Sequence, residues 1–102
     1  MRQELYGNLP LVRSLCEQGA DKEARDSIGQ TPLHNTVIFN QLPVVQYLIE
    51  QGADINAKRT GTGRQNDDAT PLHLAVDNDH IPVVQYLCEQ GAYKEAVNKF
   101  GW

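Results

Sequence analysis

Apolar residues recur along the chain in short blocks at helical spacing. The clearest block consists of Leu42, Val45, Leu48 and Ile49. Steps of three or four positions connect its members, so they would share one face of a helix. Gly52 follows the block at the place where a left-handed residue often ends a helix. The pattern predicts a short amphipathic helix that begins near Leu42 and ends before Gly52.

A second helix is predicted immediately before this one. Thr31 is a suitable N-cap, and Pro32 suits the first helical position because its missing N–H would have no partner there. Leu33, Val37 and Ile38 continue the apolar pattern at helical spacing. A break near residues 40 and 41 separates the two helices. The unit therefore consists of two short helices, and the residues between units favour a turn.

The same unit returns along the chain, as a search for internal repeats shows. Residues 42–48 recur almost letter for letter at 81–87, and more loosely at 9–15. The sequence Glu-Gln-Gly-Ala occurs three times, and its glycines are separated by 33 and then 39 residues. The surplus of six residues lies between Ala57 and Thr70. A surface loop tolerates such an insertion because its closure entropy grows slowly with length.

The unit resembles the ankyrin repeat. The resemblance rests on Thr31-Pro32-Leu33-His34, on Val44-Val45 through Leu48, on residues 52–57 and on the 33-residue period. It implies an all-α solenoid of antiparallel helix pairs with projecting β-turn fingers. It covers essentially the whole chain, as about two and three-quarter repeats without dedicated polar caps. We predict one domain, 1–102, with units at about 1–25, 26–64 including the six-residue finger insertion, and 65–97, and the start of a next finger at 98–102.

Composition narrows the classes of partner. Hydrophobic residues make up 40% and charged residues 22% of the chain, as in ordinary soluble domains. The net charge of −4 has the wrong sign for binding phosphates or an anionic membrane. No apolar run approaches the ~18 residues of a membrane span, and no apolar signal core follows the start. We predict a soluble cytoplasmic protein that binds neither nucleic acid nor a membrane.

The residues capable of catalysis or metal binding do not match a known site. His34 and His73 share one repeat position, where the resemblance implies a hydrogen bond between adjacent units. Residues 77–79 open like a calcium loop, but the later glycine and glutamate of such a loop are absent. Cys16 and Cys88 are two units apart, too far for a disulfide. We predict no catalytic residue, no cofactor and no metal, and therefore no enzyme.

The resemblance places a partner against the fingers and the first helix of each pair. Position by position, this surface comprises Ser27, Ile28, Gln30, Ile38, Phe39, Asn66, Asp67, Asp77 and Asn78, with a basic finger tip of Lys58, Arg59 and Arg64. Ile38 and Phe39 would alternatively pack between repeats. Asn56 resembles the asparagine that hydroxylases modify in many ankyrin repeats, although shaping the finger is its favoured role.

We therefore predict a non-catalytic protein–protein interaction module, whose partner is another protein that the sequence does not identify. The alternative is a self-associating or engineered ankyrin-repeat array or fragment without a dedicated partner. In that case apolar surface at the two ends of the array would favour end-to-end self-association.

Overall fold

The computed structural model describes residues 7–27, 29–59 and 69–92. Within this part of the chain every regular element is an α-helix. The helices are α2 (Leu9–Glu17), α3 (Pro32–Ile38), α4 (Leu42–Glu50), α5 (Pro71–Asp77) and α6 (Ile81–Glu89). The all-α fold predicted from the repeat is confirmed.

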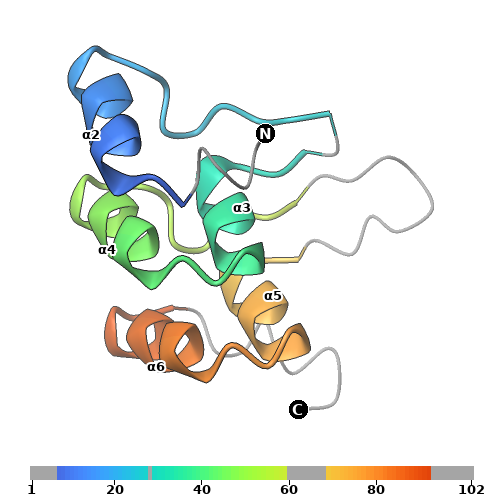
Figure 1. Cartoon of the computed structure of the whole chain (residues 1–102). Coiled ribbons are helices and arrows are strands. Elements are labelled where there is room, and N and C mark those ends of the chain that lie inside the picture. Colours follow the sequence, from blue (N-terminus) through green and yellow to red (C-terminus); the bar gives the residue numbers. More distant parts are fainter. Residues whose placement is uncertain (1–6, 28, 60–68, 93–102) are drawn as a thin grey trace.

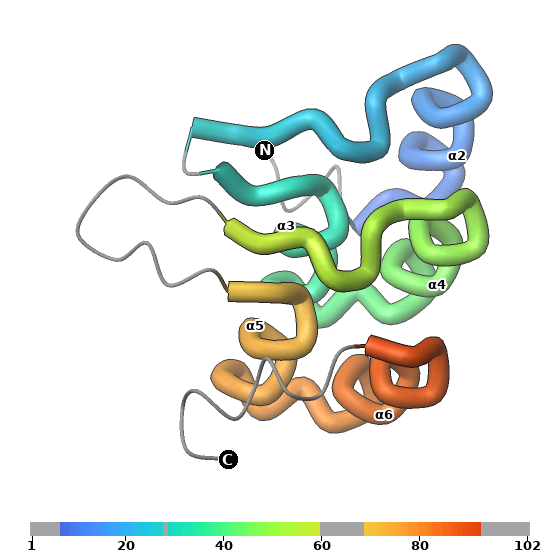
Figure 2. The backbone as a smooth tube through the Cα atoms, turned by 180° about the vertical axis from the view of Figure 1, so that it is seen from behind, coloured from blue at the N-terminus to red at the C-terminus, as the bar shows by residue number. Residues whose placement is uncertain are grey.

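The helices form two layers (Figure 1). Helices α2, α4 and α6 stack as an outer layer, and α3 and α5 stack beside them as an inner layer. Each inner helix also packs on the outer helix that follows it in the chain. The segments that leave α2 and α4 run side by side and extend past the inner layer (Figure 2). These extended segments are the fingers that the resemblance implies.

The inner helices begin at the predicted threonines. The Oγ1 atom of Thr31 accepts a hydrogen bond from the backbone N–H of His34, and Nδ1 of His34 accepts one from the N–H of Thr31. Thr70 and His73 repeat this arrangement at the start of α5. Two backbone donors that a helix start normally leaves unpaired are thereby satisfied.

Left-handed residues end the helices where the chain must change direction. Asn40 and Asp79, at equivalent repeat positions, have φ angles of 57° and 58° and connect each inner helix to the next outer helix. Gly52 has a φ of 91° just after α4, as its position predicted. Asparagine and aspartate tolerate this conformation better than other residues with a side chain. Short helices can therefore follow one another with little intervening chain.

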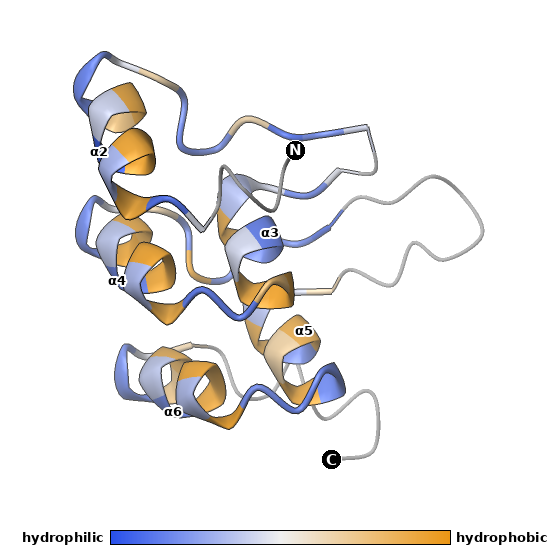
Figure 3. Cartoon of the chain, in the orientation of Figure 1, coloured by the Kyte–Doolittle hydropathy of each residue, from blue (hydrophilic) through white to orange (hydrophobic). Residues whose placement is uncertain are grey.

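The core lies between the two layers. The apolar faces of the outer helices turn toward the inner layer (Figure 3). In α4 the residues Val44, Val45 and Leu48 are all buried, while Leu42 and Ile49 of the predicted stripe are half-buried. The buried surface of α4 is wider than the predicted stripe because α2, α3 and α6 all contact this helix.

Candidate functional site

His34 links two successive units inside the core. Its side chain is fully buried, and its Nε2 atom lies 2.9 Å from the carbonyl oxygen of Ala69. Because a carbonyl oxygen only accepts hydrogen bonds, Nε2 carries the proton, while Nδ1 accepts from Thr31. The contact between adjacent units that the resemblance implies is confirmed for this histidine.

The environment of His34 keeps its imidazole neutral. Burial lowers the pKa of His34 below its ordinary value of 6.5, and the positive charges of Arg25 and Arg59 lower it further. The hydrogen bond to Ala69 opposes this shift of the pKa but does not reverse it. A second proton would also place a donor on Nδ1 opposite the N–H of Thr31. His34 therefore has a structural role in joining the units.

Asp26 shapes the first finger. One carboxylate oxygen accepts a hydrogen bond from the backbone N–H of Gln30 at 3.0 Å, and the other accepts one from Asn35 Nδ2 at 3.3 Å. The N–H of Asp26 donates to the carbonyl of Gln30 at 2.9 Å. Gln30 is only 4% exposed. The prediction that Gln30 belongs to the exposed binding surface is therefore wrong, because these bonds draw it against the base of the finger.

The two described fingers are connected to each other. Nη1 of Arg25 donates to the carbonyls of Gly29 and Lys58, both at 2.7 Å. Ser27 and Lys58 are exposed in these fingers, and Arg59 is half-buried. We call Ser27, Lys58 and Arg59 the finger cluster. Arg25 is also exposed. The sequence alone did not identify it as part of the binding surface, although it occupies the repeat position of Lys58, 33 residues earlier.

The second group of predicted residues lies where the inner helices end. Ile38 and Phe39 follow one another at the end of α3 and are half-buried, and Asp77 and Asn78 at the end of α5 are exposed. We call these four residues the helix-end cluster. They come together because α3 packs on α5, which brings equivalent repeat positions side by side.

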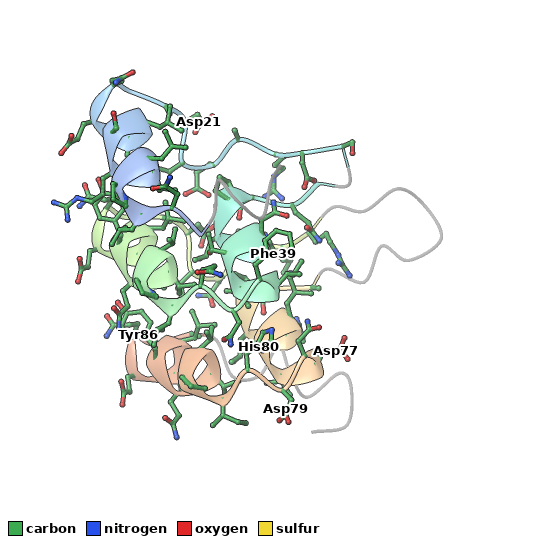
Figure 4. The ribbon with its side chains drawn as sticks, viewed as in Figure 1. Asp21, Phe39, Asp77, Asp79, His80 and Tyr86 are labelled. Atoms are coloured by element: carbon green, nitrogen blue, oxygen red, sulfur yellow. The ribbon has the colours of Figure 1, made fainter. Side chains whose placement is uncertain are left out.

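The neighbours of the helix-end cluster are polar. Phe39, Asp77, Asp79 and His80 lie on the side of the inner-helix ends, whereas Tyr86 lies in the outer layer (Figure 4). Nε2 of His80 is 3.2 Å from the carbonyl oxygen of Ile38, so the loop before α6 is held against the end of α3. An aromatic and an aliphatic residue at the end of α3 thus share this side of the molecule with exposed carboxylates at the end of α5 and in the loop that follows it.

Four predicted residues, namely Ile28, Arg64, Asn66 and Asp67, lie outside the described residues. The finger cluster and the helix-end cluster occupy opposite ends of the inner helices. An inner helix of 7 residues is about 10 Å long at ~1.5 Å per residue. A partner that contacts both clusters must therefore span this distance along the inner layer.

In residues 7–27, 29–59 and 69–92, no three His, Cys, Asp or Glu side chains gather in an arrangement that could hold a metal ion. Within the same ranges no helix has the length and apolar character needed to cross a membrane. Cys16 and Cys88 are half-buried free thiols.

Comparison with known proteins agrees with the geometry. A family model described as "Ankyrin repeats (3 copies)" matches residues 3–98. A search of curated proteins finds no match. Ankyrin repeats are generally non-catalytic modules for protein–protein interaction. The match covers nearly the whole sequence, and the capped inner helices, stacked outer helices and projecting fingers have the expected order. This chain belongs to the ankyrin-repeat family.

Proposed function

We propose that the chain binds a protein partner through the helix-end cluster and the finger cluster. The observation that carries the proposal is the composition of the helix-end cluster. Phe39 is half-buried at the end of α3, and Asp77 is exposed at the end of the neighbouring helix α5. An aromatic anchor surrounded by polar groups is the usual composition of an energetically important contact between proteins.

The charges of the two clusters differ in sign. The helix-end cluster contains Asp77 and is adjacent to the exposed Asp79, whereas the finger cluster contains Lys58 and Arg59 beside Arg25. Complementary charges increase the rate of encounter and select the orientation of a partner. The proposed partner therefore has a basic surface that meets the helix ends and an acidic surface that meets the fingers.

The proposal is tested by comparing charge reversals on two sides of the molecule. Proteins captured by cross-linking to the chain would be identified and purified, and their association rates measured with Asp77→Lys and with Glu89→Lys. Both residues are exposed at helix ends and undergo the same change of charge, but Glu89 belongs to the outer layer. Exposed substitutions of this kind usually change stability by less than ~0.5 kcal/mol.

We expect Asp77→Lys to slow association at least severalfold at low salt and Glu89→Lys to leave it near the parent value. Raising the salt concentration should reduce the difference between the two variants, because screening weakens contacts between exposed charges. A partner that binds both variants at the parent rate contacts another face, and that result contradicts the proposal. Phe39→Ala tests the aromatic anchor in the same assay, and it should mainly accelerate dissociation.

A further inference from the structure

One row of apolar positions is uncovered in the first unit and buried in the others. Leu11 is 42% exposed and Leu15 is 37% exposed on α2. The equivalent residues of α4 and α6 are at most 2% exposed, and they are Val44, Leu48, Val83 and Leu87. These positions are occupied by leucine or valine in all three units, so residue type does not explain the difference.

The row continues from the helix into the finger. Ala20 and Ala24 are exposed after α2. Ala53 and Ala57, the equivalent residues one unit later, are 8% and 4% exposed. Ala92, the third counterpart of Ala20, is 5% exposed. The units differ in the outer helix that precedes them in the stack. Helix α4 packs against the preceding α2, and α6 packs against the preceding α4. We call Leu11, Leu15, Ala20 and Ala24 the leading face.

The opposite side of the outer layer shows the reverse pattern. Ile81 in α6 is 51% exposed, whereas the equivalent Leu9 and Leu42 are half-buried and pack against the core. Val84 is half-buried, and its counterpart Val45 in α4 is fully buried. In α2 and α4 these positions are covered by the unit that follows. The equivalent positions of α6 are thus more exposed. We call Ile81 and Val84 the trailing face.

We propose that the leading face of one copy of this chain binds the trailing face of another. In this arrangement α6 of one copy packs on α2 of the next, in the way that α2 packs on α4 within the chain. The second copy is the indicated occupant because the chain already makes the same kind of junction twice, between α2 and α4 and between α4 and α6. The contact is head-to-tail, so a free leading face remains and further copies can add.

The contact between copies is weaker than the junction between α2 and α4. Inside the chain the guanidinium of Arg13 lies over the ring of Tyr47, 5.5 Å from its centroid. Gln85 and Ser14 hold the corresponding repeat positions in the proposed contact. The cation–π attraction is therefore absent there. Association should accordingly be reversible and depend on protein concentration.

Complementary variants of the whole chain test the proposal. Leu11→Glu combined with Leu15→Glu blocks the leading face, and Ile81→Glu blocks the trailing face. In sedimentation velocity the parent should gain mass as its concentration rises, while each variant alone should remain a monomer. A mixture of the two variants should form a 1:1 dimer and stop there, since each variant supplies one intact face. Gln51→Glu, an exposed change in the middle unit, should associate like the parent.

A parent that stays monomeric up to millimolar concentration would overturn the proposal. So would a variant that still dimerises alone, because that result indicates a contact between two identical faces. A mixture of folded variants that remains monomeric also contradicts the head-to-tail arrangement. Circular dichroism establishes that the variants are folded, and Leu11→Glu alone replaces the double variant if the latter unfolds. The contact uses the outer layer, so the test is independent of the proposed binding at the inner layer.

Discussion

Replacing leucine by alanine at one repeat position measures how much the stacking of units contributes to stability. Leu15 and Leu48 occupy the same position in successive units, but Leu15 is 37% exposed and Leu48 is 2% exposed. Both changes remove the same atoms from the last turn of an outer helix. The difference between their effects on the free energy of unfolding therefore reports the difference in burial.

The expected magnitudes follow from this exposure. Each change removes three carbon groups, which contribute roughly 2.4 kcal/mol when fully buried, at about 0.8 kcal/mol per group. At Leu48 the neighbouring side chains would also border a cavity, so we expect a total loss of about 3–4 kcal/mol. Leu15 is already 37% exposed, and the vacated space opens to solvent. The expected loss at Leu15 is therefore about 1–1.5 kcal/mol.

Urea denaturation followed by circular dichroism provides the measurement. The protein is kept dilute, because association through the leading face would cover Leu15. Leu87→Ala, at the equivalent fully buried position of α6, is a second reference and should resemble Leu48→Ala. Equal losses at Leu15 and Leu48 in monomeric protein would refute the reasoning, since they would show that the first unit is covered as completely as the second.

Three further changes test other parts of the structure. Lys22→Ile should raise the free energy of unfolding by about 0.5–2 kcal/mol in urea melts, because Lys22 lines a largely apolar pocket of about 200 Å³ and the equivalent Ile55 packs against the core. Stability should fall as the pH drops below 6.5, because the unfolded chain then binds a proton that folded His34 resists. His34→Gln should reduce this dependence in melts recorded at successive pH values, whereas an unchanged slope would contradict the assignment. Removing residues 60–65, which restores the 33-residue period, should preserve the circular dichroism spectrum and shift the free energy of unfolding by less than ~1 kcal/mol. A loss of helicity would show that the insertion lies elsewhere.

The helices could be predicted because each depends on local signals. Thr31 and Pro32 specify the start of α3 within one turn, and Gly52 supplies the left-handed residue after α4. The repeat then provides the order of the helices without any calculation of tertiary contacts. The width of the buried surface of α4 was underestimated, since Val44 lies outside the predicted stripe and is buried by neighbours on more than one side.

The candidate site could be predicted only in part. A repeat alignment identifies equivalent positions, but it does not state how far each side chain is covered. Gln30 was therefore placed on the surface although it is 4% exposed. Arg25 was overlooked because its role depends on a hydrogen bond to the carbonyl of Lys58 in another unit. The binding roles of the finger cluster and the helix-end cluster stay predictions, which the association rates of the charge-reversal variants test.

The carbonyl of Ala69 has a consequence for how this chain can vary in length. It accepts hydrogen bonds from the N–H of Arg59 at 2.8 Å and from Nε2 of His34 at 2.9 Å. The two ends of the finger, at residues 59 and 69, are thus held together by a hydrogen bond, and the buried His34 fixes this pair to the core. These two hydrogen bonds hold α4 and α5 in the same way regardless of how many residues separate positions 59 and 69. This pair of positions is consequently a suitable insertion site. A foreign peptide inserted between residues 59 and 69 would be held at both of its ends on an unaltered scaffold.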